Sequence, residues 1–293
     1  MERRSLRIAC YLSLADLILA GSAVWAADFQ AGLQAYQRGD YAAAVREWRP
    51  LAEAGEADAQ FRLAGMYSGG QGLPQNVAEA VRWYRLAAEQ GHTEAQYMLG
   101  VTYQMGGRGL QADYSEALKW YRLAAEKGSA KAQYAVGFAY QSGAPAGTSS
   151  GASVLAPDLN EALKWFRLAA EQGQADAQFS LGVLYAGLRN TASRRIPEDY
   201  AEAIRWYEKA AGQGIAQAEF NLARMYQNGV GVAPDPATAI KWYEMAYDHG
   251  LVSAGFDLGA IYEYGRGVAQ TAKRLPSGMN PPRMPETQLR GSG

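Results

Sequence analysis

The residues that could carry out catalysis are few in this sequence. Ser149 lies in the stretch "GTSSG" at 147–151, which matches the G-x-S-x-G pattern of a nucleophilic serine. That chemistry needs the serine on a tight turn between a strand and a helix, with a histidine base nearby. The surrounding residues are rich in Gly, Ala, Ser and Pro and show no strand pattern. We therefore interpret the match as a chance one and assign no catalytic residue.

The sequence supports metal or thiol chemistry no better than it supports a nucleophilic serine. His92 and His249 are the two histidines, and each stands beside a glycine, with no cluster of Cys or Asp near it. A zinc site or a catalytic triad needs further ligands or partners. Cys10 is the one cysteine and falls in the N-terminal segment described next. We expect no metal site, no cofactor and no thiol nucleophile, and we expect the histidines to suit helix C-termini.

Residues 1–26 have the layout of a bacterial secretory signal peptide. The basic start "MERRSLR" precedes an apolar run, and Val24 and Ala26 stand three and one residues before a cleavage point ahead of Ala27. The run is short for a membrane span and Asp16 interrupts it, although an uncleaved N-terminal anchor remains the alternative. We expect a periplasmic or secreted bacterial protein, with no integral membrane span once this segment is removed.

The slightly negative net charge of the chain is unfavourable for binding nucleic acid. The formal net charge is -1, and much of the positive charge lies in the N-terminal segment and in the stretch after Arg266. The body of the chain is therefore more acidic than the whole, and it would repel phosphate on average.

The rest of the chain consists of one sequence unit that is repeated several times. "EALKWYRLAAEKG" at 116–128 returns as "EALKWFRLAAEQG" at 161–173. The tryptophan recurs at unequal intervals of 36 to 45 residues. A tyrosine upstream of it and a glycine downstream of it recur at the same intervals. Such a pattern indicates one structural unit joined by loops of variable length. We expect these aromatic residues to form the structural core of the repeats: Tyr67, Trp83, Tyr103, Trp120, Tyr140, Trp165, Tyr185, Trp206, Tyr226 and Trp242.

Each unit predicts a helical hairpin. In the first half, Ala59, Leu63 and Tyr67 are spaced by four and share one helical face. The second half places Trp120 within the apolar stripe of an amphipathic helix, which Gly128 then ends. A small residue after the recurrent Leu or Val lets the two helices approach closely, and we expect the tryptophan to fill the remaining space. This small position is held by Ala64, Gly100, Gly137, Gly182, Ala223 and Gly259.

The two halves together resemble a known repeat. "AQYMLGVTYQMGG" followed by "EALKWYRLAAEKG" resembles the Sel-1-like repeat (SLR), a relative of the tetratricopeptide repeat, over about residues 57–267. The resemblance implies an all-α fold, an α-solenoid (right-handed superhelix) of stacked antiparallel helical hairpins that is a scaffold for other proteins. It also implies a divergent hairpin at 27–56, repeats at 57–91, 92–128, 129–173, 174–214 and 215–250, and a partial repeat with a capping helix at 251–267. The signal peptide at 1–26 precedes these units, and the Pro, Gly and charge content of residues 268–293 predicts a disordered tail.

The first helices carry the candidate binding residues. By resemblance to tetratricopeptide repeats, their side opposite Leu63 faces the concave surface, and it bears an aromatic residue in every unit. Two interpretations stay open: packing between neighbouring repeats, or a groove for an extended peptide or a glycan strand. On the second interpretation the partner-binding residues are Phe61, Tyr97, Tyr134, Phe179, Phe220, Gln104, Gln141 and Gln227. The insertion at 143–157 and the basic loop with Arg189, Arg194 and Arg195 are either loop-length variation or further partner contacts.

The predicted function is a non-enzymatic protein–protein interaction scaffold or regulator of the bacterial cell envelope. It would bind a partner protein, of unknown identity, through the concave solenoid surface. A peptidoglycan- or polysaccharide-binding module is the alternative. A β-lactam-active enzyme or envelope hydrolase is a further one, which the absence of an S-x-x-K motif and of cysteine in the repeats weakens.

Overall fold

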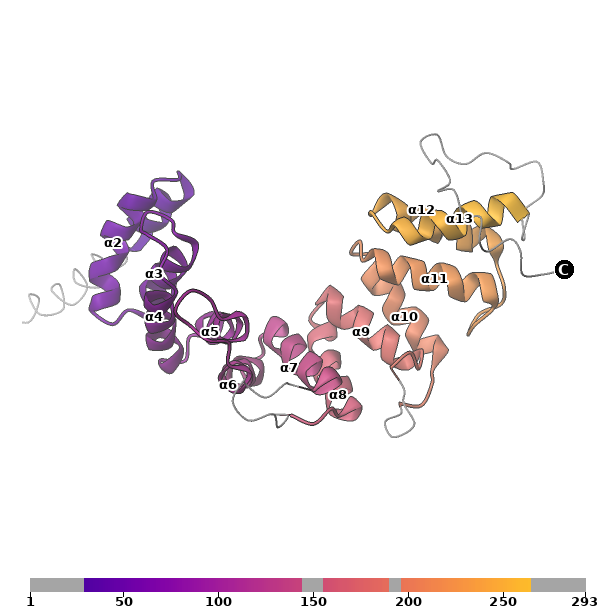
Figure 1. Cartoon of the computed structure of the whole chain (residues 1–293), viewed down its shortest axis with the longest axis horizontal. Helices are drawn as coiled ribbons and strands as arrows, with labels where there is room; N and C mark the ends of the chain where they lie inside the picture. Colours follow the sequence, from indigo (N-terminus) through magenta and orange to yellow (C-terminus); the bar gives the residue numbers. More distant parts are fainter. Residues whose placement is uncertain (1–28, 144–154, 190–195, 265–293) are drawn as a thin grey trace, which may run out of the picture. The chain divides into compact units, whose positions relative to one another are not determined.

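The fold is built from helices joined by short connections. The computed structural model describes residues 29–143, 155–189 and 196–264. Within these ranges the regular structure is helical, apart from isolated bridge residues such as Gly107 and Leu110 (Figure 1). The all-α class predicted from the repeats is confirmed.

Residues 29–37 form the first helical segment of the described chain. The helices that follow are α2 (Tyr41–Glu53), α3 (Ala57–Gly69), α4 (Val77–Glu89), α5 (Thr93–Met105), α6 (Tyr114–Glu126), α7 (Ala130–Ser142), α8 (Leu159–Glu171), α9 (Ala175–Tyr185), α10 (Tyr200–Ala211), α11 (Ala216–Asn228), α12 (Pro236–Asp248) and α13 (Val252–Tyr264).

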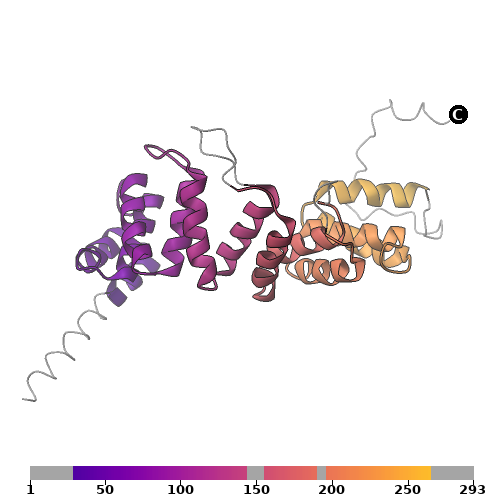
Figure 2. The ribbon, with the colours of Figure 1, turned by 90° about the horizontal axis from the view of Figure 1, so that it is seen from below.

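Consecutive helices pack against each other within two compact units. One unit reaches to Ala132 and the other begins at Gln133, so the boundary falls inside α7. In the first unit α3 packs on α4 and α5 on α6, and α4 also contacts α5. In the second, α9 packs on α10 and α11 on α12, with α10 against α11 and α12 against α13 (Figure 2). Each unit is thus a run of the α-solenoid that the repeats predict.

A backbone hydrogen bond at the base of each hairpin explains why its loop can vary in length. The N-cap residue of each second helix donates its backbone N–H to the carbonyl of the recurrent tyrosine, as Asp113 does to Tyr103 at 2.8 Å and Asp199 to Tyr185 at 2.9 Å. The cap side chain also accepts from the first turn of its own helix. This closure recurs whatever the number of residues between tyrosine and cap, so insertions leave the hairpin intact. The same bond joins Asn76 to Tyr67, Asp158 to Tyr140 and Asp235 to Tyr226.

The close approach of the two helices depends on the small position of the first helix. A Cβ built at Gly100 would lie 2.6 Å from the ring of Tyr121, and one at Gly182 would lie 2.5 Å from the ring of Tyr207. Gly137 stands in the same relation to Phe166, at 2.7 Å. The space that we expected the tryptophan to fill is therefore filled by the aromatic residue that follows it. This core aromatic is buried in every repeat: Tyr84, Tyr121, Phe166, Tyr207 and Tyr243.

The tryptophans precede these core aromatics on the second helices, and their burial differs between repeats. Trp83, Trp120 and Trp206 are buried, whereas Trp165 and Trp242 are partly exposed. The three buried indole N–H groups have no hydrogen-bond partner within the described chain. Cations of the same helix cover some of the rings, since the Lys209 ammonium lies 3.9 Å from the centroid of Trp206.

The glycine and the core aromatic give a direct test of this packing. We expect Gly182→Ala to reduce the free energy of unfolding by about 1–3 kcal/mol, because the added methyl group overlaps the Tyr207 ring. Urea denaturation followed by circular dichroism measures the change. Gly259→Ala is the matched control: it holds the same repeat position, and a Cβ there meets no described atom within 4 Å. Since alanine favours a helix more than glycine does, the control should lose no stability, and an equal loss in both variants would contradict the requirement set by contact with the aromatic ring.

Candidate functional site

The candidate site is the set of aromatic side chains on the first helices, which we call the first-helix face. Phe61 on α3 and Tyr97 on α5 belong to the first unit; Tyr134 on α7, Phe179 on α9 and Phe220 on α11 belong to the second. All five are partly buried, neither enclosed in the core nor free in solvent.

Each of these rings packs against the core aromatic of its own repeat. The ring centroids of Tyr97 and Tyr121 are 5.7 Å apart, and the other four pairs lie between 5.6 and 6.0 Å. The contact fixes one edge of the ring and leaves part of it exposed. This ring contact lies within a repeat, and the Phe61 ring also stacks on His92 at the start of the next repeat, so the packing between neighbouring repeats that the sequence suggests occurs as well. The pairs are Phe61 with Tyr84, Tyr97 with Tyr121, Tyr134 with Phe166, Phe179 with Tyr207, and Phe220 with Tyr243.

The two tyrosines of this face stay neutral at physiological pH. Burial raises the pKa of Tyr97 above its ordinary value. Burial also raises the pKa of Tyr134, with a contribution from the Asp176 carboxylate, and a hydrogen bond with Ser180 opposes the rise. Both hydroxyls are therefore neutral hydrogen-bonding groups, and that of Tyr134 already contacts Ser180.

In two repeats, the glutamine that we expected to contact a partner forms a hydrogen bond with a core tyrosine instead. The Tyr121 hydroxyl donates to Gln104 Oε1 at 2.6 Å, and the Tyr243 hydroxyl donates to Gln227 Oε1 at 2.7 Å. These bonds satisfy core hydroxyls whose pKa burial raises above the ordinary value. Gln141 holds the same position in the repeat whose core aromatic is Phe166, which has no hydroxyl to donate.

A second row of glutamines, which the sequence analysis missed, ties neighbouring helices together. The buried Gln60 donates to the Ala52 carbonyl of the preceding helix at 3.1 Å and accepts from Gln90 at 2.8 Å. Gln178 repeats the arrangement, donating to Ala170 at 3.1 Å and accepting from Gln213 at 2.7 Å. The recurrent "AQ" at the start of each first helix was the signal for this row.

The fifth repeat replaces this pair of amides by an acid and a histidine. Glu219 stands where the other repeats have the buried glutamine, and it is fully buried. His249 Nδ1 lies 2.9 Å from both of its carboxylate oxygens. The carboxylate thus has one histidine as its side-chain partner among the described residues.

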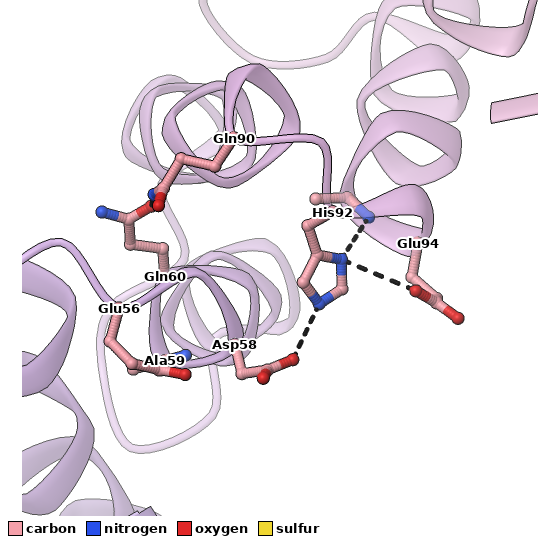
Figure 3. Close-up of polar contacts among 8 residues, drawn as sticks. Glu56, Asp58, Ala59, Gln60, Gln90, His92 and Glu94 are labelled. Atoms are coloured by element: carbon pink, nitrogen blue, oxygen red, sulfur yellow. Dashed lines mark hydrogen bonds and ion pairs between the residues drawn. The ribbon is translucent and has the colours of Figure 1, made fainter. Parts of the chain in front are cut away.

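His92 connects the first two repeats through its contact with Asp58 (Figure 3). It is the N-cap of α5, where the Ala95 backbone N–H donates to its Nδ1 at 3.1 Å. Since Nδ1 accepts, Nε2 carries the proton and donates to Asp58 Oδ1 at 3.0 Å. The ring stacks on Phe61 with centroids 4.7 Å apart. His92 therefore caps a helix N-terminus, and the C-terminal role that we expected for it is wrong.

The comparisons with known proteins agree with this geometry. The model of the Sel1 repeat matches residues 57–92, 93–129, 130–174, 175–215, 216–251 and 252–271. The chain belongs to the Sel1 repeat family. Proteins of this family are generally scaffolds for protein interaction. No match was found among the curated proteins.

Two solved structures are similar to this Sel1 repeat protein. One is a protective antigen of uropathogenic Escherichia coli strains that displays an SLR fold, with 32% sequence identity and a TM-score of 0.75. The match covers 85% of this chain and 51% of the antigen, so the chain spans about half of the antigen's length. The other is a Sel1 repeat protein from Oxalobacter formigenes, with 28% identity, a TM-score of 0.69, and coverage of 84% and 92%.

Several predicted features of this Sel1 repeat protein lie outside the described residues. These are the signal peptide, Ser149 with most of its insertion, Arg194 and Arg195, and the tail. Across the described ranges no helix is both long and apolar enough to cross a bilayer. In the same ranges, no three His, Asp or Glu side chains gather as a metal ion requires.

Proposed function

We propose that this Sel1 repeat protein binds a partner protein through the first-helix face and is a scaffold or regulator in the bacterial cell envelope. The observation that carries the proposal is the repeated aromatic pair. One ring of each pair is enclosed, and it fixes a second ring that stays partly exposed. Aromatic side chains held in one orientation lose little entropy on binding and are frequent anchors of protein interfaces.

Exposed residues beside the rings supply the variation that selectivity needs. The second residue of the first helix differs in character between repeats and is exposed in each: Asp58, Glu94, Lys131, Asp176 and Gln217. A ring that recurs in every repeat, with a different charge next to it each time, suits one partner sequence over others, because a like charge or an unpaired one disfavours the wrong partner.

The proposed location rests on the N-terminal segment and on one relative. Residues 1–26 have the layout of a secretory signal peptide. The similar Escherichia coli protein is a protective antigen, which agrees with an exported chain. Both observations support the cell envelope as the place where the partner is met.

Paired substitutions test the proposal. We expect Tyr97→Ala with Tyr134→Ala to reduce capture of envelope proteins by the purified chain at least about tenfold, because interface anchors contribute about 2 kcal/mol or more each. Affinity purification from the envelope fraction with quantitative mass spectrometry measures the loss. Circular dichroism checks that helical content is kept.

Leu86→Ala with Leu123→Ala is the matched control. These side chains are also apolar and each is 37% exposed, but they lie on the second helices α4 and α6. The control should capture the same proteins as the unmodified chain. Equal capture by both pairs would contradict the proposal, and binding to purified sacculi in place of proteins would favour the peptidoglycan-binding alternative.

A further inference from the structure

A cavity of about 220 Å³ lies between the fourth and fifth repeats, within the second unit. Its walls come from the end of α9, the start of α10 and one side of α11. Apolar groups of Ala186, Leu188, Met225 and Val230 line it together with Tyr207. None of the first-helix aromatics lines it, so it is separate from the first-helix face.

The cavity exists because one side chain is shortened. Ala186 follows the recurrent tyrosine of the fourth repeat, where the second and fifth repeats have Gln104 and Gln227. In those repeats the glutamine reaches the core tyrosine and accepts from its hydroxyl. Alanine lacks both the volume and the acceptor, so the space beside Tyr207 is left open.

The first repeat independently shows the same relation between a small residue after the recurrent tyrosine and a cavity beside it. Its residue after the recurrent tyrosine is also small, Ser68, and a cavity of about 900 Å³ is found there within the first unit. Val77, Met98 and Met105 line it, at the repeat positions that Tyr200, Asn221 and Asn228 hold around the cavity beside Tyr207. A small residue at this position therefore accompanies a cavity between successive repeats in each unit.

The hydroxyl of Tyr207 makes the second-unit cavity selective. It is buried and has no hydrogen-bond partner within the described chain. Burial raises the pKa of Tyr207, so its hydroxyl stays neutral at physiological pH. A neutral buried hydroxyl without a partner is unfavourable, and an acceptor brought next to it would relieve this.

We propose that this cavity is a binding site for a compact apolar group of about phenyl size that carries a hydrogen-bond acceptor. The size follows from the volume, since about 150 Å³ is enough to hold benzene, and the cavity beside Tyr207 opens to solvent, which gives a ligand a path of entry. The acceptor follows from the Tyr207 hydroxyl, which has no hydrogen-bond partner within the described chain, and the amides of Asn221 and Asn228 can donate to the same acceptor. Arg224 is the charged residue of the described lining, so a cationic ligand is disfavoured.

Methyl NMR on the full chain tests the site with benzamide as the probe. We expect benzamide to shift the methyl signals of Ala186, Leu188 and Met225, and benzylamine, a cation of the same size, to leave them unchanged. Ala186→Gln restores the glutamine of the other repeats and should weaken benzamide binding at least about tenfold, as expected when the space and the hydroxyl are both occupied. Ala186→Ser keeps the space, as Ser68 does in the first repeat, and should retain binding.

The result that overturns the proposal is the absence of saturable shifts at these methyl groups with benzamide, or equal shifts in the Ala186→Gln variant. Equal binding of benzylamine would overturn the acceptor requirement. Acetyl-phenylalanine amide, compared with benzamide, distinguishes the two sources of such a group. Tighter binding of the capped amino acid assigns the site to a residue of a protein partner, and the reverse order assigns it to a free small molecule.

Discussion

Phe166→Ala is expected to lower the free energy of unfolding by about 3–5 kcal/mol. Phe166 is fully buried on α8, and its ring fills the space that Gly137 leaves open on α7. It also supports Tyr134, with ring centroids 5.7 Å apart. Alanine would leave a cavity between the two helices of the third repeat, because the surrounding backbone relaxes only in part.

Trp165→Ala is the control for this prediction. Trp165 is the adjacent residue and the larger ring, but it is partly exposed. Its removal should reduce stability by about 1 kcal/mol, the centre of the distribution for point substitutions in general. Urea denaturation of the two variants gives the comparison, and a larger loss for Trp165→Ala would reverse the packing roles assigned to the two aromatic residues.

His249→Ala should reduce stability by about 3 kcal/mol, because it leaves the Glu219 carboxylate buried without its side-chain partner. Carboxylates are almost never fully buried unless they are paired. Thermal and urea unfolding at neutral pH measure the loss, with the unmodified chain as reference.

The double variant Glu219→Gln with His249→Gln separates loss of the hydrogen-bonded pair from loss of packing. This variant gives the fifth repeat the pair of hydrogen-bonded amides that Gln178 and Gln213 form in the fourth repeat. We expect its stability to lie close to that of the unmodified chain. If His249→Ala instead changed stability by less than about 0.5 kcal/mol, as surface substitutions do, the pair would have no structural importance.

The fold could be predicted from the sequence because the repeat marks are local. Helical periodicity, the helix-ending glycine and the recurrent tyrosine each lie within one helix or one turn. Periodicity could not show which of two adjacent aromatics enters the hairpin core. Trp120 and Tyr121 both belong to the apolar stripe, and only the position of Gly100 on the facing helix distinguishes them.

The roles of the glutamines in the candidate site were harder to predict, because they too depend on how two helices pack. Gln104 and Gln227 looked like variable surface residues, although each accepts a hydrogen bond from a tyrosine of the following helix. Such a contact depends on how two helices pack, which sequence spacing does not reveal. The aromatic residues of the first-helix face were found from the sequence, because they recur once per repeat opposite the recurrent leucine.

Site-specific photo-crosslinking tests the central proposal most directly. A benzophenone-bearing phenylalanine is placed at Tyr97 on α5 or, in a separate chain, at Leu123 on α6, and intact cells are irradiated. We predict protein adducts from position 97 and none from position 123, since the partner binds the first-helix face. Adducts from position 123 alone, or equal yields from both positions, would contradict recognition by this face.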